Sequence, residues 1–228
     1  MELWYSVSSK EKTIAPLPDS ILVNGVKAKD VLAGSGFEEG DIHVIGSVRF
    51  GNPTNTKRIP QPGDRKNILV VLSGEFDRSA EVIVKCIRAF DNRDDLRVLF
   101  KPHPTLPPEM YADFKSRLST VLSFTSEPVQ SLFTSTDLVI YSDSTAAVEA
   151  AAMGIPVLHI KSDFTFDMNV FEDRESIPSV RSAEEVRTRA LEILSGIPPE
   201  PAGLMHAANA FFAPVDDAKI QAFFSDIT

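Results

Sequence analysis

The segment from Asp137 to Ile160, DLVIYSDSTAAVEAAAMGIPVLHI, limits most strongly what this chain can fold into. Two short apolar runs rich in β-branched residues, typical of strands buried on both faces, enclose an alanine-rich stretch. The alanines predict a helix over residues 145–153, with Gly154 as its left-handed end and Pro156 beyond it. The segment therefore predicts a strand, a helix and a second strand.

Small polar side chains stand where this helix is expected to begin. Ser142, Asp143 and Ser144 are three candidate N-cap residues in a row. The start of a helix has backbone N–H groups without intrahelical partners and carries the positive end of the helix dipole. The loop after the first strand is therefore a candidate phosphate site.

Glu149 is the one charged residue of the expected helix. It follows Thr145 by four positions and Ser142 by seven, so all three fall on roughly one face. There the carboxylate could accept hydrogen bonds from ribose hydroxyls, two turns below a phosphate. In the other interpretation the hydroxyls are ordinary caps and Glu149 is a solvated position. The helix alone leaves both open.

Strands and helices alternate along most of the chain. Apolar runs near residues 67–72, 97–101, 121–124, 137–141 and 156–160 are separated by helical stretches. This alternation predicts an α/β fold, a Rossmann-like parallel sheet covered by helices on both faces.

Punctuation in the sequence divides the chain into four parts. Residues 1–46 contain about one βαβ unit and suggest the remnant or end of an amino-terminal Rossmann-like domain. Residues 47–66, with several glycines and prolines, are expected to be a linker. Residues 67–200 form the main α/β domain, and residues 201–228 form carboxy-terminal helices.

Ligands of parallel sheets bind outside the carboxyl ends of the strands, so the residues there are candidates for a site. Ser73 and Gly74 follow the first strand of the main domain, and Gly74 allows close backbone approach. Lys101 and His103 follow the second strand. His103 stands between two prolines on a stiff turn, where it could bind a phosphate or act as an acid. A loop histidine without a role is the alternative.

Composition excludes several classes of function. A net charge of −9 argues against a nucleic-acid partner. The single cysteine, Cys86, allows no intramolecular disulfide. No leader pattern and no apolar run of about 18 residues appears, which predicts a cytoplasmic chain without an integral membrane segment. Metal-ligand, serine-hydrolase and P-loop spacings are missing from the sequence.

The phenylalanines after the last strand also have two interpretations. Phe164, Phe166 and Phe171 are expected mainly to pack in the interior. Alternatively, they stack on a base or face a partner domain.

Two short motifs together resemble the carboxy-terminal domain of GT-B glycosyltransferases. They are KPHP at residues 101–104 and SDSTAAVEAAAMGIPVLHI at residues 142–160. More narrowly, they are similar to bacterial sialyltransferases, capsule Kdo transferases and CDP-glycerol glycerophosphotransferases. Those families carry a His-Pro motif and a Ser-Ser or Ser-Thr motif at the nucleotide-phosphate site. The resemblance covers about residues 67–195.

The resemblance implies roles for particular residues. His103 would match the His-Pro motif and act at the leaving phosphate, and Ser144-Thr145, with Ser142 nearby, would match the second motif. Glu149 falls where many GT-B enzymes place the acid that holds the ribose. The implied substrate is a nucleotide-activated sugar with a CMP or CDP carrier, used in surface polysaccharide biosynthesis. No metal cofactor is expected.

The resemblance also implies that part of the enzyme lies elsewhere. A GT-B enzyme has two such domains, and residues 1–46 supply only about one βαβ unit of the first. The resemblance therefore implies a carboxy-terminal half, with the acceptor site on an amino-terminal domain or a partner chain. The expected location of the protein is the cytoplasm, including the inner face of the membrane as a peripheral protein. The final helices would resemble the GT-B tail that crosses back to the first domain.

Three other functions remain compatible with the sequence. A UDP-N-acetylglucosamine 2-epimerase-like enzyme has the same fold and would prefer uridine. A catalytically inactive module would bind the nucleotide sugar without transfer. A flavodoxin-like α/β domain would have no nucleotide-sugar role.

Overall fold

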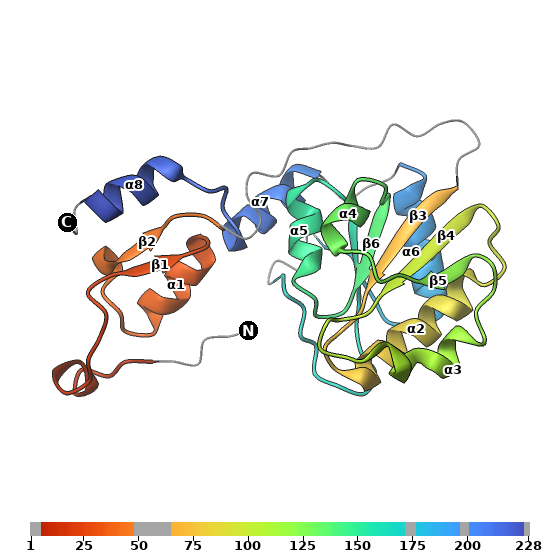
Figure 1. Cartoon of the computed structure of the whole chain (residues 1–228), viewed down its shortest axis with the longest axis horizontal. Helices are drawn as coiled ribbons and strands as arrows, with labels where there is room; N and C mark the ends of the chain where they lie inside the picture. The colour runs from red at the N-terminus through yellow and green to blue at the C-terminus, as the bar shows by residue number, and fades with distance from the viewer. Residues whose placement is uncertain (1–5, 48–64, 172–176, 197–200, 226–228) are drawn as a thin grey trace. The chain divides into compact units, whose positions relative to one another are not determined.

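The computed structural model describes residues 6–47, 65–171, 177–196 and 201–225 of the chain (Figure 1). The residues cluster into two compact units, one of residues 55–205 and one of residues 1–54 together with 206–228. The linker expected over residues 47–66 lies almost entirely outside the described residues.

The larger unit is built on a six-stranded parallel sheet with the order β5-β4-β3-β6-β7-β8 (Figure 1). Its strands are β3 (Lys66–Val71), β4 (Leu96–Lys101), β5 (Leu122–Phe124), β6 (Leu138–Tyr141), β7 (Val157–Ile160) and β8 (Ser179–Val180). The chain moves outward from β3 to β5, then returns to add β6, β7 and β8 on the other side of β3. The strand order therefore reverses between β3 and β6, and a crevice is expected at their carboxyl ends.

Helices cover both faces of this sheet, as predicted (Figure 1). They are α2 (Phe76–Phe90), the turn η3 (Pro108–Tyr111) with α3 (Ala112–Lys115), α4 (Val129–Phe133), α5 (Ala146–Ala152) and α6 (Ala183–Leu194). Helix α2 packs against α6. Its residues Val82, Cys86 and Phe90 are spaced by four and buried, which is the periodicity of an amphipathic helix.

The two strands beside the switch point are deeply buried. Residues 68–71 of β3 and 138–141 of β6 are at most 3% exposed. Each fully buried large apolar side chain stabilises a fold by about 1.5–3 kcal/mol relative to an exposed one. The loops that leave these strands are therefore held on a rigid base.

The smaller unit contains a βαβ element, as the sequence predicts. Parallel strands β1 (Ile21–Val23) and β2 (Ile42–Val44) are joined by α1 (Val26–Gly34), with short turns η1 (Glu11–Thr13) and η2 (Glu39–Asp41). Val23, Leu32 and Ile42 form its small core.

The end of the chain belongs to this smaller unit from His206 onward. The two expected carboxy-terminal helices are α7 (Pro201–Phe211) and α8 (Asp217–Ser225). Between them, Ala213 donates from its N–H to Asn24 and accepts from Ser47, at 2.9 Å in both cases. These bonds bridge the loops that leave β1 and β2. Of the described helices, none has the length and apolar character needed to cross a membrane.

Candidate functional site

The register of the sheet brings the predicted strand-end residues to one edge. Val71 of β3 pairs with Lys101 of β4 on one side and with Tyr141 of β6 on the other. The segments that follow the three strands therefore leave the sheet at one level. These segments carry Ser73-Gly74, His103 and residues 142–145.

Gly74 and His103 lie next to each other. A β-carbon placed on Gly74 would be 3.5 Å from His103 Nδ1 and 3.5 Å from Thr105 Oγ1. His103 Nδ1 is 2.7 Å from that hydroxyl and accepts from the Thr105 N–H at 3.3 Å. Among the described residues Nε2 has no hydrogen-bond partner, so the ring is fixed on one side and open on the other.

Ser73 joins the loops after β3 and β6. Its buried hydroxyl donates to Asp143 Oδ2 at 2.8 Å and accepts from the Glu75 N–H at 3.0 Å. Arg78, in the first turn of α2, places Nη1 3.5 Å from the same Asp143 oxygen. The crevice between β3 and β6 is thus bridged by polar side chains.

The start of α5 differs from the sequence prediction. The helix runs over seven residues, Ala146–Ala152, with Thr145 at the N-cap and no side-chain cap hydrogen bond. The physical reason is that Asp143, one predicted cap, is occupied by Ser73 and Arg78. Ser144 Oγ still accepts from the Ala146 N–H, at 3.4 Å. Gly154 ends the helical segment with a φ of 73°, as predicted.

Glu149 is buried rather than solvated, so the solvated interpretation is wrong. It is 6% exposed on α5, and Gln130 Nε2 of α4 donates to its Oε2 at 3.2 Å. A buried carboxylate needs hydrogen-bond donors, and the neighbouring helix supplies one.

Lys101 points away from the crevice. Its Nζ donates to the Ser126 carbonyl at 3.3 Å, in the loop after β5. In the sheet, β5 lies on the far side of β4 from β3. Lys101 and His103 both line an open groove of about 560 Å³ over β4 and β5. His103 is therefore shared between this groove and the Gly74 loop.

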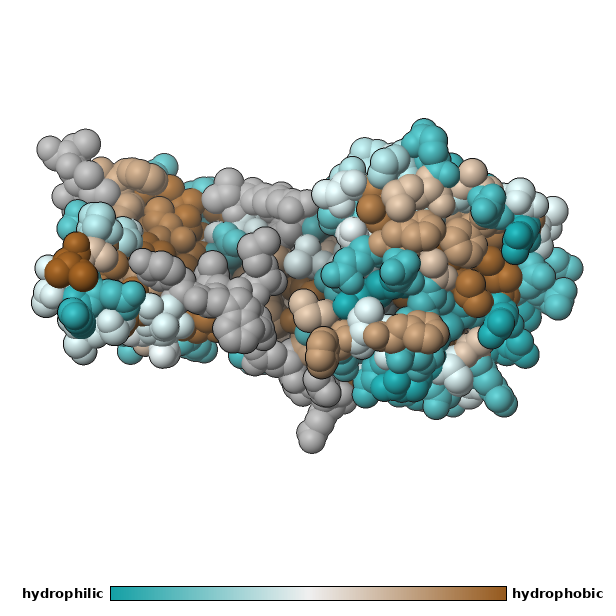
Figure 2. Space-filling view, turned by 90° about the horizontal axis from the view of Figure 1, so that it is seen from below, coloured by the Kyte–Doolittle hydropathy of each residue, from teal (hydrophilic) through white to brown (hydrophobic). Residues whose placement is uncertain are grey.

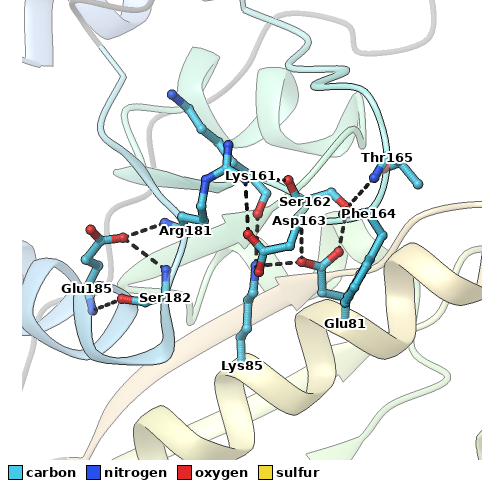
Figure 3. Close-up of polar contacts among 10 residues, drawn as sticks. All are labelled: Glu81, Lys85, Lys161, Ser162, Asp163, Phe164, Thr165, Arg181, Ser182 and Glu185. Atoms are coloured by element: carbon cyan, nitrogen blue, oxygen red, sulfur yellow. Dashed lines mark hydrogen bonds and ion pairs between the residues drawn. The ribbon is translucent and has the colours of Figure 1, made fainter.

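A polar network fixes the loop after β7 to α2 (Figure 3). Lys85 Nζ lies 2.6 Å from Glu81 Oε1 and 3.0 Å from Asp163 Oδ2, and donates to the Lys161 carbonyl at 3.0 Å. Glu81 also accepts from Ser162 Oγ at 2.5 Å and from the Asp163 N–H at 2.7 Å. Burial alone would raise the pKa of Glu81, but these hydrogen bonds outweigh it and lower the pKa.

Two polar residues further along this loop contact buried side chains of the sheet. Asp167 Oδ1 lies 3.3 Å from Nε2 of buried His159, and Asn169 Oδ1 accepts from the hydroxyl of buried Tyr141 at 2.7 Å. Burial is the main cause that raises the pKa of Tyr141.

Two phenylalanines of the same loop point outward. Phe164 is 85% exposed and Phe166 is 91% exposed, so they do not pack in the interior as the sequence suggested. Phe171 does, at 1% exposed. Figure 2 shows apolar and polar residues interleaved over the face of the larger unit that it presents.

From the sequence, Arg78 was not identified as a residue of this site, and Asp143 was considered only as a helix cap. For Arg78 the helical spacing of the sequence contained a signal of burial. Arg78 precedes Val82 by four residues and Cys86 by eight, so the helical period places it on the buried face of α2. It is 4% exposed. Among the described residues, no group of three or more His, Cys, Asp or Glu side chains could hold a metal ion.

No protein-family model and no curated protein matches the sequence, but solved structures share the fold. A UDP-N-acetylglucosamine 2-epimerase from Listeria monocytogenes, itself of putative function, superimposes with a TM-score of 0.58 at 18% identity, over 84% of this chain and 56% of that one. The wall teichoic acid polymerase TagF gives 0.55 at 16% identity, over 92% and 57%. The calicheamicin glycosyltransferase gives 0.57 at 16% identity, over 88% and 51%.

These comparisons establish a GT-B glycosyltransferase-like fold. The chain spans little more than half the length of each of the three structures. Transferases and an epimerase superimpose on this chain about equally well.

Proposed function

We propose that this chain is the donor-nucleotide-binding half of a glycosyltransferase in surface polysaccharide biosynthesis, with a CMP-activated or CDP-linked donor. One observation carries the proposal: Ser73-Gly74, His103 and the loop of residues 142–145 leave neighbouring strands at the switch point of the sheet. In open α/β sheets, ligands bind in the crevice at that point.

The loops of the crevice supply groups suited to a phosphate. Gly74 lets a ligand approach the backbone closely, and the His103 ring lies next to it. Ser144 and Thr145 add hydroxyls and backbone N–H groups at the entrance to α5. Because α5 is short, these local donors, rather than the dipole of a long helix, would bind the phosphate oxygens.

The chemistry assigned to His103 follows from its fixed ring. In glycosyl transfer, the bond between the sugar carbon and the phosphate oxygen breaks, and the nucleotide leaves with the electron pair. A hydrogen bond from His103 Nε2 to that oxygen would stabilise the developing charge, while Nδ1 stays on Thr105. Glu149 is proposed to accept from the ribose hydroxyls in addition to Gln130.

The acceptor site is proposed to lie outside this chain. The three similar structures each contain nearly as much chain again. An amino-terminal domain or a partner chain would bring the acceptor and its base, in the cytoplasm or at the inner face of the membrane. The chain alone would bind donor and transfer little or nothing.

A UDP-N-acetylglucosamine 2-epimerase-like function is the second candidate. It is favoured by the similarity to the Listeria monocytogenes structure, which is as close as that to the transferases. Preference for uridine over cytidine nucleotides would support it. An inactive binding module would show donor binding without transfer even after the amino-terminal half is restored.

Titration calorimetry with CMP, CDP and UDP tests the proposed function. At least one nucleotide is expected to bind, and His103→Ala is expected to raise its Kd about tenfold or more, since a hydrogen bond to a charged group is worth about 1.5–3 kcal/mol. His206→Ala, at an exposed position of α7, is the matched control and should leave Kd unchanged. Absence of binding by all three nucleotides, or equal binding by the His103 variant, contradicts the proposal.

A further inference from the structure

Arg78 is buried at the switch point with an incomplete set of partners. Its side chain is 5% exposed. Nη1 lies 3.5 Å from Asp143 Oδ2 and Nη2 lies 3.4 Å from Glu75 Oε2. Among the described residues, Arg78 Nε has no hydrogen-bond partner, and neither has the buried Asp143 Oδ1 on the opposite side of the crevice.

The N···O distances from Arg78 to Glu75 and Asp143 are longer than those of a well-formed ion pair. Charge-assisted N–H···O bonds in proteins are about 2.7–2.9 Å long, and buried polar atoms are nearly always bonded. Here a buried donor and a buried acceptor stay unsatisfied within one cluster. Lys85, the other buried cation of α2, already has three partners (Figure 3). Arg78 is therefore the buried cation of this helix with capacity for a ligand.

The start of α2 adds further donors at the same place. The helix is 15 residues long, its N-cap residue is Glu75, and no side-chain cap hydrogen bond is recorded for it. Gly74, directly before the cap, is exposed and carries no side chain. Backbone N–H groups of a first turn and a buried guanidinium together form an anion site.

We propose that Arg78 binds the phosphate of the donor nucleotide, and that Asp143 holds the place of that phosphate while the chain is without ligand. This rests on the proposed function, which it deepens by adding a cation to the crevice. On binding, phosphate oxygens accept from Nη1 and Nη2 of Arg78, the edge of the guanidinium that Asp143 and Glu75 contact in the chain without ligand. Asp143 keeps its bond from Ser73 Oγ, so its carboxylate is not left unpaired.

Nearby carboxylates do not block this site. Glu75 is 66% exposed on its side chain and can turn into solvent, where its charge is hydrated. Asp77 is exposed as well. Asp143 is the buried competitor, and its removal should therefore favour an anion.

The test is calorimetry on the full chain with CDP and UDP, and NMR titration with cytidine and uridine. Arg78→Gln is expected to raise the Kd of the nucleotide that binds about ten- to a hundredfold, while the matching nucleoside binds as before. Arg78→Lys keeps the charge without the planar fork and should lie between. Asp143→Asn should bind the nucleotide at least as tightly as the unmodified chain. Arg97→Gln, at an exposed position of β4, is the control for loss of one positive charge.

The outcomes separate the two proposals. If the unmodified chain binds no nucleotide, the proposed function fails, and the role of Arg78 fails with it. If it binds nucleotide and Arg78→Gln binds equally well, only the role of Arg78 is overturned. A loss of nucleotide affinity in Asp143→Asn as large as in Arg78→Gln would mean that the Arg78–Asp143 contact only holds two loops together. That result would also overturn the proposal that phosphate replaces Asp143 on Arg78. Circular dichroism identifies an unfolded variant, in which case Arg78→Lys and Asp143→Asn decide.

Discussion

Removal of the Lys85 ammonium group should destabilise the larger unit strongly. The side chains of Lys85 and Glu81 are only 10% and 6% exposed, and their charged atoms lie 2.6 Å apart (Figure 3). Lys85→Met keeps much of the apolar stem but leaves the Glu81 carboxylate buried without its cation. The other groups on Glu81, Ser162 Oγ and the Asp163 N–H, are hydrogen-bond donors without a positive charge.

The size of the effect follows from the burial of the pair. Loss of one partner of a buried ion pair costs about 3–5 kcal/mol. Because two hydrogen bonds to Glu81 remain, we expect the lower end, about 3 kcal/mol. For a unit of this size, 1 kcal/mol corresponds to about 2–4 °C, so the melting temperature should fall by about 6–12 °C. Arg189→Met is the control: Arg189 and Glu192 are 38% and 42% exposed, and exposed pairs contribute about 0–1 kcal/mol.

Acid should reduce the difference between Lys85→Met and the unmodified chain. The folded-state pKa of Glu81 is lowered, so its contribution is fully present above the ordinary carboxyl pKa and is lost as pH falls through the folded value. Once Glu81 is protonated in both proteins, little ionic interaction remains to be lost. The gap should therefore be widest near pH 7 and narrow below about pH 4.

Urea denaturation at several pH values, followed by circular dichroism, measures both effects. A double-mutant cycle with Glu81→Gln measures the pairwise term. Glutamine keeps an acceptor oxygen for only one of the two donors, Ser162 Oγ or the Asp163 N–H, so the cycle, and not the single variant, is compared with the expected loss. A loss below about 1 kcal/mol at pH 7, or a gap that does not change with pH, would refute the reasoning that this pair is buried and charged.

Two further substitutions test other parts of the structure. Gly74→Ala places a methyl group at ordinary contact distance from His103. The free energy of unfolding should stay level or rise by about 0.4–1 kcal/mol, while nucleotide affinity falls. A calorimetric Kd equal to that of the unmodified chain would contradict the role of the loop. Ser182→Ala removes the N-cap acceptor of α6, which forms a capping box with Glu185, and should lower the free energy of unfolding by about 1 kcal/mol in thermal denaturation. The control Ser195→Ala, directly after the helix, should cost less. Equal losses in the two variants would argue against the cap.

Much of the local structure could be predicted from the sequence. The apolar runs of β3, β6 and β7 are continuous because parallel strands are covered on both faces. The capping box of Ser182 and Glu185 at the start of α6 is a purely local arrangement, with the Ser-x-x-Glu spacing already present in the sequence. The left-handed Gly154 is local in the same way.

Other expectations failed because they depended on distant contacts. Asp143 reads as a helix cap in sequence, but Ser73 and Arg78 approach it only after β3 and β6 have paired. Phe164 and Phe166 are large apolar residues of the kind that usually packs in a core. They point outward because Asp167 and Asn169, in the same loop, are bonded to buried partners.

The sequence by itself determined which segments are strands and helices and which polar residues follow the strands, because periodicity, caps and breakers act within a few residues of one another. The tertiary structure alone decided which of those residues meet. Strand order is chosen by packing across the whole sheet. That order brings Asp143 to Ser73 and His103 to Gly74, and it turns Lys101 toward the far side of β4. Burial of Glu149 has the same origin, since α4, a separate helix, packs against it.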